Sequence, residues 1–364
     1  MSVATTQTAA VVCQSGAHDA SNVRISSTHP VPVPAEGEVL IKLEYSGVCH
    51  SDLHSIRGDT PMTTDVAGHE GIGKVVQGGQ LLSLTTEMST RSYSSSRGWL
   101  WSSCLECEIC AINHTACPHQ RNAGANVPGT FQQYVVSPAA HVTKIPTGLD
   151  PAMTAPLLCA GIAMYSSIKK TKARSGDWLA IIGAGGGLGH MGIQIASAQG
   201  IKVLAIDSGE KKKDLCLSLG ATEFLDYKAV DVVSAAKSCT SGYGVHAVVC
   251  TANGEKAYEQ SMHMLRPLGT LVCVGIPNLP FRLPATPFDM IVRGKHPVEL
   301  THLIGLTIVG NSAGTAQEMN ELLEMAVADK VKAHVEVYDL QAIGDVLHKL
   351  ESAEIEGRAV LQIP

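Results

Sequence analysis

The segment GVCHSDLH, residues 47–54, places a cysteine, two histidines, a serine and an aspartate within eight positions. Each polar group needs a partner if it leaves water, so we expect the segment to line a cavity or to face solvent. Further along the chain, AGHEG contains His69 and LLCAG contains Cys159. Either residue alone would more often be an ordinary buried side chain. Together with Cys49 they form the set of two thiolates and one imidazole that holds a catalytic zinc with one coordination position open.

A second group of cysteines is compact in the sequence. The stretch CLECEICAINHTAC spaces them as C-x2-C-x2-C-x6-C. Four thiolates within one short lobe fill all four corners of a tetrahedral zinc and leave no position for a substrate. The sequence therefore predicts a structural zinc site over residues 104–117, with metal-free thiols as the alternative. Its four ligands would be Cys104, Cys107, Cys110 and Cys117.

The stretch IIGAGGGLGHMG is a glycine-rich turn between an apolar run and a helix-like segment. Glycines allow the backbone to approach a pyrophosphate, and the amides at the following helix N-terminus are free to bind it. Asp207 ends the next apolar run, 18 residues after Gly189, where a carboxylate can accept hydrogen bonds from an adenosine ribose. With no arginine beside Asp207, NAD is favoured over NADP, although Lys211 to Lys213 weaken that preference unless they form a solvated helix face. The candidate cofactor-binding residues of the turn are Gly183, Ala184, Gly185, Gly186, Gly187, Leu188 and Gly189.

These candidate residues need secondary-structure elements to position them. From residue 176 onward, six short apolar runs alternate mostly with helix-like segments, which is typical of a parallel, doubly wound sheet. Residues 1–160 are rich in proline and glycine, and their short β-like segments indicate an irregular, mostly β domain. Residues 313–364 contain two further β-like runs around an amphipathic helix and are expected to return to the first domain. The expected fold class is therefore α/β, with a Rossmann domain over residues 161–312.

Composition limits the classes of function. With 364 residues the chain is long enough for two domains, and its 45% hydrophobic and 16% charged residues are typical of a compact protein. The net charge is -6 and the basic residues are dispersed, which argues against nucleic-acid binding. The chain has neither a basic, apolar leader nor a run of roughly 20 apolar residues, so we expect a cytoplasmic protein with no membrane contact. In that compartment its eleven cysteines are expected to be metal ligands or buried thiols rather than disulfides.

Over nearly the whole chain, the order of these motifs resembles the zinc-containing medium-chain alcohol dehydrogenases, and most closely their fungal and yeast branch. The segments that carry the resemblance are GVCHSDLH, AGHEGIG, the four-cysteine lobe, GTFQQY, APLLCAG, GAGGGLG, AID and EGRAV. The resemblance implies a GroES-like catalytic domain in addition to the Rossmann domain, one catalytic and one structural Zn²⁺ per chain, and NAD as the cofactor. It also implies a homodimer or homotetramer that acts on a small alcohol or aldehyde.

The resemblance further implies roles for the residues around the predicted catalytic zinc. Glu70 would be a nearby or transient ligand, and Asp52 would orient the imidazole of His69. Ser51 and His54 resemble the family's proton relay. An alcohol deprotonated at the zinc would then pass hydride to the nicotinamide, while its proton leaves through the relay. Cofactor contacts would come from Lys212, Val274 and Ile276, and pyrophosphate contacts from His50 and Arg358.

We therefore expect an NAD-dependent alcohol dehydrogenase that interconverts primary or secondary alcohols with aldehydes or ketones. Two segments depart from the family pattern. Residues 78–98 are rich in serine and threonine and lack an expected β-strand, and residues 295–305 interrupt the sequence before the last apolar run. These segments leave open an inactive relative or an artefact of gene prediction. A zinc-free quinone or enoyl reductase of the same fold is the other alternative, although such proteins lack the zinc-ligand set.

Overall fold

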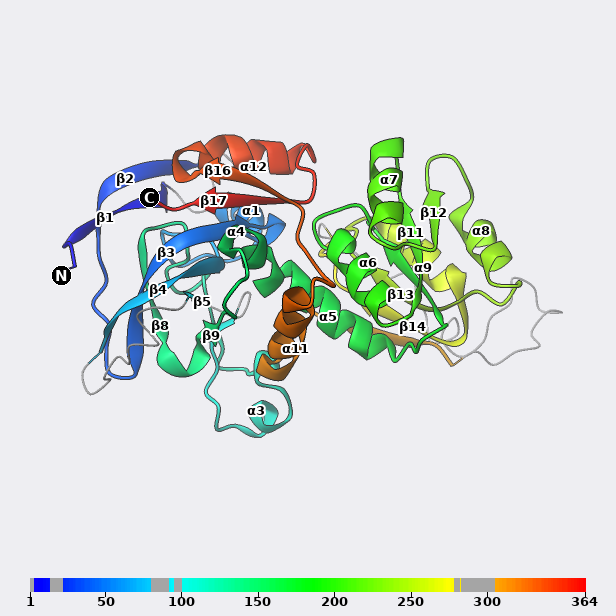
Figure 1. Cartoon of the computed structure of the whole chain (residues 1–364), viewed down its shortest axis with the longest axis horizontal. Coiled ribbons are helices and arrows are strands. Elements are labelled where there is room, and N and C mark those ends of the chain that lie inside the picture. Colours follow the sequence, from blue (N-terminus) through cyan, green and yellow to red (C-terminus); the bar gives the residue numbers. More distant parts are fainter. Residues whose placement is uncertain (1–2, 14–21, 80–91, 95–99, 278–281, 283–304) are drawn as a thin grey trace. The chain divides into compact units, whose positions relative to one another are not determined.

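The computed structural model describes residues 3–13, 22–79, 92–94, 100–277, 282 and 305–364. The chain divides into two compact units, whose elements are labelled in Figure 1. The first unit comprises Met1–Ile162 and Ala313–Pro364, and the second unit comprises Ala163–Ser312. The first unit is therefore built from two separate stretches of the chain.

The second unit contains a parallel sheet. Its six strands are β10 (Trp178–Ile182), β11 (Lys202–Asp207), β12 (Glu223–Asp226), β13 (Val245–Cys250), β14 (Leu265–Cys273) and β15 (Thr307–Gly310). They lie in the order β12-β11-β10-β13-β14-β15, and every neighbouring pair is parallel. The central strands are apolar along their length, as expected where both faces of a parallel sheet are covered. In β10, for example, every residue from Leu179 to Ile182 is buried.

Helices cover both faces of this sheet (Figure 1). They are α5 (Ala160–Thr171), which crosses the boundary between the units, α6 (Gly189–Ala198), α7 (Glu210–Ser218), α8 (Val232–Cys239) and α9 (Glu255–Met264). Ile182 of β10 shares a hydrophobic cluster with Val232 of α8 and Met262 of α9, so these helices cover one face. On the other face, Gly192 of α6 packs so closely that an added Cβ would lie 3.3 Å from Ile181. This doubly wound arrangement confirms the predicted Rossmann fold.

The first unit is built mainly of strands, as predicted, and most of its strand pairs are antiparallel. Its largest sheet has the order β16-β17-β3-β4-β5-β9, and β8 also pairs with β3. These strands are β3 (Glu38–Val48), β4 (Glu70–Gly78), β5 (Ser92–Ser94), β8 (Tyr134–Pro138), β9 (Thr143–Lys144), β16 (Val335–Asp339) and β17 (Arg358–Gln362). Two small sheets pair β1 (Thr6–Val12) with β2 (Val23–Pro30) and β6 (Leu100–Ser102) with β7 (Arg121–Asn122). Because β17 pairs with β3, the last residues of the chain complete a sheet begun near its start.

A hydrophobic core supports this sheet. Ile41 and Leu43 of β3 pack in one cluster with Val346, Leu347 and Leu350 of α12 (Ile343–Glu351), whose spacing places them on one face of the helix. Burial of each such side chain stabilises the fold by about 1.5–3 kcal/mol. The core fixes β3, which leads directly into α1 (His50–Arg57). The other helical elements of this unit are α3 (Glu108–Asn113), η1 (His114–Ala116), η2 (Ala139–His141), α4 (Pro151–Thr154), η3 (Ala155–Leu158), α11 (Ala316–Val327) and η4 (Leu340–Ala342).

The two segments that break the family pattern are only partly described. The expectation that residues 78–98 lack a strand is wrong, because β5 lies within them and pairs antiparallel with β4 and β9. The polar residues of β5, Ser-Tyr-Ser, give no apolar alternation from which a strand could be recognised. Residues 80–91, 95–99 and 283–304 lie outside the described residues.

Among the described residues, no single helix is long and apolar enough to cross a membrane. One bent pair of helices in the described part of the chain, Pro151–Leu158 with Ala160–Thr171, has the length and composition of a membrane span.

Candidate metal and cofactor sites

Four potential metal ligands from three segments meet in the first unit. Cys49 is the N-cap of α1, His69 immediately precedes β4, Glu70 begins β4, and Cys159 follows η3. One donor atom of each lies within 4.8 Å of all the others, and His69 Nε2 lies 3.2 Å from Cys159 Sγ. The structure thus brings together the three residues predicted to hold a catalytic zinc and the glutamate predicted beside them.

The spacing and chemistry of this cluster fit a tetrahedral zinc. Bonds of roughly 2.0–2.3 Å to nitrogen and sulfur place neighbouring ligands about 3.3–3.8 Å apart, close to the 3.2 Å between His69 Nε2 and Cys159 Sγ. Cys49, His69 and Glu70 are buried, and Cys159 is half-buried. Two thiolates would offset the divalent charge of the ion, which makes its burial less costly. We conclude that the residues present fit the metal.

Asp52 holds two of the predicted ligands in place. It lies in the first turn of α1, and its Oδ2 accepts a hydrogen bond of 2.9 Å from the backbone N–H of Cys49, which closes a capping box. Its Oδ1 accepts hydrogen bonds from the backbone N–H of Gly68, at 3.2 Å, and from His69 Nδ1, at 2.8 Å. An ionised carboxylate can only accept, so Nδ1 of His69 carries the proton and Nε2 is left for a metal.

Buried charges and hydrogen bonds set the acidity of the ligands. Burial lowers the pKa of His69, but the charges and hydrogen bonds of Asp52 and Cys49 together raise that pKa well above its ordinary value. The pKa of Cys49 lies well below its usual range, chiefly because of a hydrogen bond from the Cys159 thiol, which outweighs the effect of burial. The environment therefore favours a thiolate at Cys49, and the thiolate is the form that binds metal.

Glu70 and Arg358 form a buried ion pair at the same cluster. The guanidinium of Arg358, at the start of β17, contacts Oε1 of Glu70. Burial raises the pKa of Glu70 to about 7 although the charge of Arg358 opposes it. Among the described residues, Oε2 of Glu70 has no hydrogen-bond partner, which suits a carboxylate that can approach a metal. Arg358 is only 3% exposed, and its contact with a pyrophosphate remains a prediction.

The predicted proton relay lies on α1. Ser51 and His54 are the second and fifth residues of this helix, and His50, the predicted pyrophosphate contact, is the first, directly after Cys49. His54 Nδ1 lies 3.1 Å from Oδ2 of Asp59, which follows the helix. Sequence reasoning did not single out Asp59. The available signal is the Gly-Asp pair after the helix, because a left-handed glycine turns the next residue back toward the helix end.

The four cysteines of the predicted structural zinc lobe also meet. The Sγ atom of Cys104 lies 3.8 Å from that of Cys110 and 3.6 Å from that of Cys117, and Cys107 completes a set within 4.8 Å. Zinc–sulfur bonds of about 2.3 Å require such separations in a tetrahedral site. Backbone N–H groups of Glu106 and Cys107 lower the pKa of Cys104 to about 6, which favours its thiolate. The lobe therefore fits a second zinc.

The predicted cofactor turn joins β10 to α6 in the second unit. Its residues are Gly183, Ala184, Gly185, Gly186, Gly187 and Leu188, followed by Gly189 at the start of α6. Gly183 has a φ of +80°, and a Cβ at Gly189 would lie 2.2 Å from the carbonyl oxygen of Gly183. Both positions therefore require glycine. The turn leads from the carboxyl end of β10 to the N-terminus of α6, the place where such sheets bind a pyrophosphate.

Asp207 lies beside this turn, at the end of β11, and is 5% exposed. Its Oδ2 accepts a hydrogen bond of 2.9 Å from the N–H of Gly185, and its Oδ1 lies 3.0 Å from Lys212 Nζ. These contacts anchor the carboxylate where ribose recognition is predicted. Val274 and Ile276 follow β14 in the same unit, and Ile276 is 58% exposed.

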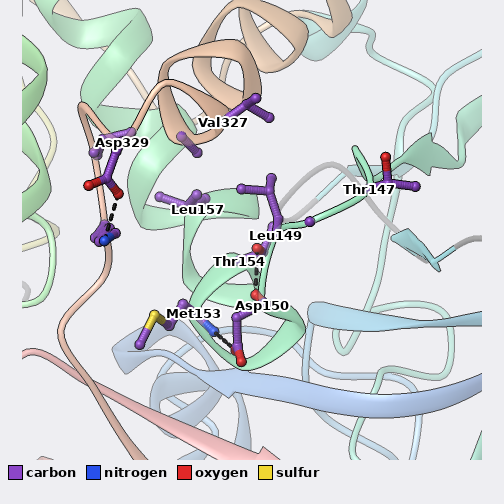
Figure 2. A pocket seen from close by; sticks show the side chains of 12 residues that line it. Thr147, Leu149, Asp150, Met153, Thr154, Leu157, Val327 and Asp329 are labelled. Atoms are coloured by element: carbon purple, nitrogen blue, oxygen red, sulfur yellow. Dashed lines mark hydrogen bonds and ion pairs between the residues drawn. The ribbon is translucent and has the colours of Figure 1, made fainter.

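A pocket of about 390 Å³ lies in the first unit and contains none of the cluster residues (Figure 2). Four of its polar side chains, those of Asp150, Thr154, Asp329 and Lys332, are engaged within the protein. Asp150 Oδ1 accepts the N–H of Met153 at 3.0 Å, and Thr154 Oγ1 donates to the Asp150 carbonyl at 2.7 Å. Asp329 pairs with Lys332 at 2.6 Å. We assign this pocket no chemistry.

Comparisons with known proteins bear on both units. Residues 35–147 match the family described as alcohol dehydrogenase GroES-like domain, and residues 187–328 match the family described as zinc-binding dehydrogenase. Alcohol dehydrogenase 1 of Neurospora crassa is 40% identical over 339 residues, which cover 91% of each chain. This chain belongs to the zinc-containing medium-chain alcohol dehydrogenases. Another relative, the alcohol dehydrogenase of Geobacillus stearothermophilus, is 38% identical over 338 residues, or 91% of this chain and 93% of that protein.

Solved structures share the fold that this family membership implies. An acetophenone reductase of Geotrichum candidum, solved in complex with NAD, has a TM-score of 0.84 at 27% identity and covers 100% of this chain and 98% of its own. The alcohol dehydrogenase of Aeropyrum pernix has a TM-score of 0.83 at 26% identity, with coverage of 98% and 100%. The predicted combination of a GroES-like and a Rossmann domain is confirmed.

Proposed function

We propose that this chain catalyses the NAD-dependent interconversion of a primary or secondary alcohol with the corresponding aldehyde or ketone. One observation carries the proposal: Cys49, His69 and Cys159 meet around one point while Asp52 orients the imidazole. Two thiolates and one imidazole are the donor set of a catalytic zinc with an open position. The relatives at 38–40% identity are named alcohol dehydrogenases, which supports this substrate class.

Cys49, His69 and Cys159 would hold the catalytic zinc, and the ion supplies a Lewis acid that lowers the pKa of an alcohol oxygen. The protein prepares this site before substrate arrives. Asp52 keeps His69 Nε2 available by accepting a hydrogen bond from the Nδ1–H group. Burial of the cluster strengthens every electrostatic interaction within it, because the effective dielectric constant is lower there than in water.

The alcohol proton leaves through residues of α1. The Ser51 hydroxyl can accept one proton while it donates its own, so it suits the first step. His54 suits the exit, because its Nδ1 faces the Asp59 carboxylate and its Nε2 is left as the acceptor. We assign these roles from the family resemblance and from the position of both residues next to Cys49.

The second unit would bind the dinucleotide, which accepts the hydride when it is bound. The glycine turn and the N-terminus of α6 suit the pyrophosphate, and Asp207 suits the hydroxyls of the adenosine ribose. Lys212, Val274 and Ile276 are proposed contacts from the same unit, with His50 and Arg358 from the first. The bound NAD in the Geotrichum candidum structure supports this choice of cofactor.

We also propose that the chain works in the cytoplasm as a homodimer or homotetramer, without nucleic acid or membrane. All eleven cysteines are free thiols, four of them in the structural lobe and two in the catalytic cluster, which suits a reducing compartment. Light scattering on the purified protein measures the subunit number. A monomer that turns over alcohol would contradict the proposed assembly.

The two alternatives make different predictions. A zinc-free quinone or enoyl reductase has no use for either donor cluster, so it should contain no zinc. An inactive relative would keep both clusters, so only turnover distinguishes it from the enzyme.

The test of the proposal is NADH formation over a panel of primary and secondary alcohols, before and after chelation. We expect turnover that chelation abolishes and that added Zn²⁺ restores. Cys159→Ala should be inactive, whereas Cys13→Ser, which changes an exposed cysteine outside both clusters, should match the wild type. A protein that carries two zinc ions yet forms no NADH from any alcohol would overturn the proposal.

A further inference from the structure

The end of α1 is built as a Schellman motif, a compact way to stop a helix. Gly58 is in the left-handed conformation, with a φ of 82°. Its N–H donates to the carbonyl of Ser55 at 3.1 Å, and the N–H of Asp59 donates to the carbonyl of His54 at 2.9 Å. These two backbone bonds define the motif. They fold Asp59 back onto the helix, next to His54.

In such a motif, the residue at the position of Asp59 frequently makes an apolar contact with the helix. Here the contact is polar, since Oδ2 of Asp59 lies 3.1 Å from Nδ1 of His54. An ionised carboxylate has no proton to donate, so Nδ1 must be the donor. In the neutral ring, Nε2 then carries the lone pair. The side chains of His54 and Asp59 are 22% and 33% exposed, which leaves the ring access to water.

Arg57, the last residue of α1, forms an ion pair with the same carboxylate. Its Nε lies 3.6 Å from Oδ2 of Asp59, and its guanidinium lies 2.5 Å from Oε1 of Glu351 at the end of α12. Both helices belong to the first unit. The arginine therefore limits the directions that Asp59 can take and connects the end of α1 to a helix of the core.

We propose that Asp59 is a positioning residue for proton transfer: it holds His54 in the Nδ1–H tautomer and so presents Nε2 to the departing proton. This inference rests on the proposed function, because it takes His54 as the proton acceptor. The proton that arrives at Nε2 turns the ring into an imidazolium, whose charge the nearby carboxylate stabilises. The ring returns to the neutral form when it releases a proton to solvent.

The tautomer of His54 can be read from the ring-nitrogen signals of the zinc-loaded protein labelled with ¹⁵N-histidine. His54→Gln identifies the relevant signals by their loss. We expect the Nδ1–H tautomer in the wild type and in Asp59→Asn, whose amide oxygen still accepts, and a mixture of tautomers in Asp59→Ala. An Nε2–H tautomer in the wild type overturns the inference, whatever the activity of the protein.

Kinetics separate positioning from a structural role. Asp59→Ala should lower kcat for alcohol oxidation about ten-fold, because a rate loss of this size is expected when one hydrogen bond to a charged group is removed. The KM for NAD should remain nearly unchanged. Asp59→Asn should recover only part of the loss in kcat, because its amide oxygen still accepts from Nδ1–H but has no charge to stabilise the imidazolium. Glu351→Gln removes the other partner of Arg57 without touching His54 or Asp59, so its activity should remain close to that of the wild type.

The double variant decides between the two roles. If Asp59 acts through His54, adding Asp59→Ala to His54→Gln should have no further effect. A further ten-fold loss in the double variant would show that Asp59 acts by another route, and the inference would be wrong. A wild-type protein without alcohol turnover would instead contradict the proposed function, while the tautomer would still decide the position of the His54 proton.

Discussion

Oδ1 of Asp52 lies 2.8 Å from Nδ1 of His69, and both side chains are buried. Oδ2 of the same carboxylate accepts the backbone N–H of Cys49. One acidic side chain therefore orients two proposed zinc ligands that come from different segments of the first unit. This arrangement separates the residues that would bind the metal from a residue that positions them.

Asp52→Ala should weaken zinc binding although every proposed ligand remains. The imidazole of His69 and the start of α1 lose their common anchor, and loss of such a partner typically lowers metal affinity or activity roughly 10–100-fold. Zinc transfer to a chromogenic chelator measures the effect. Asp150→Asn is a suitable control, because it changes an acid at the start of α4, in the same unit but outside the cluster. A variant that keeps its catalytic zinc as tightly as the wild type would contradict this role of Asp52.

Cys107→Ser should remove the structural zinc and lower thermal stability. The lobe has short helices and little apolar core of its own, so metal binding supplies much of its folding free energy. We expect one zinc per chain and a fall in Tm of roughly 5 °C or more, measured by calorimetry. Cys13→Ser should change neither quantity. An unchanged Tm after loss of the metal would mean that the lobe does not need zinc to fold.

Asp207→Gly should reduce the preference for NAD over NADP. The carboxylate that accepts the ribose hydroxyls would be lost, and its repulsion of a ribose phosphate would be lost with it. We expect KM for NAD to rise about ten-fold or more, because the ribose loses one or two hydrogen bonds to a charged group. The kcat/KM for NADP should rise or stay unchanged. Asp207→Asn should lie between the two. Equal losses with both cofactors would point instead to collapse of the glycine turn, since Asp207 also binds Gly185.

His246 should make the folded state sensitive to mild acid. Its Nδ1 accepts the backbone N–H of Trp178 at 3.0 Å, and its Nε2 lies 3.0 Å from Asp177. Burial and the charge of Arg266 hold its pKa below the usual range, although Asp177 opposes them. The unfolded state therefore takes up a proton at higher pH than the folded state. The lowered pKa of His246 therefore adds stability that is fully present above the ordinary imidazole pKa of about 6.5. This stability is lost as the pH falls through the lower pKa of His246 in the folded state.

His246→Asn supplies the comparison for this effect, because its amide oxygen can accept the Trp178 N–H at any pH. Thermal unfolding of the wild type and of His246→Asn between pH 5 and 8 measures how the contribution of His246 to stability depends on pH. The Tm advantage of the wild type over the variant should shrink toward pH 5. A difference that stays constant across the range would show that protonation of His246 does not affect stability.

The second unit could be predicted from sequence because its parallel strands are buried on both faces. Their apolar runs and glycine-rich turn are visible without knowledge of any contact. The strand β5 was missed because Ser92–Ser94 is short and polar, and its place in the sheet depends on pairing with β4. The lobe cysteines were found from their spacing, since their separation in the sequence limits their separation in space.

The catalytic cluster is a different case. Nothing in the spacing of Cys49, His69 and Cys159 shows that they meet, because their convergence depends on the tertiary fold. Their residue types made them a candidate zinc-ligand set, and the family resemblance supported it. The contact between His54 and Asp59 was not predicted, because it follows from the backbone geometry of a turn rather than from residue type.

Zinc content per chain tests the central claim most directly. Purified wild-type protein, analysed by atomic emission against amino-acid analysis, should contain two zinc ions per chain. His69→Ala should contain one, and the combination of His69→Ala with Cys107→Ser should contain none. Retention of two ions by His69→Ala, or a wild type with only the lobe zinc, would contradict the account.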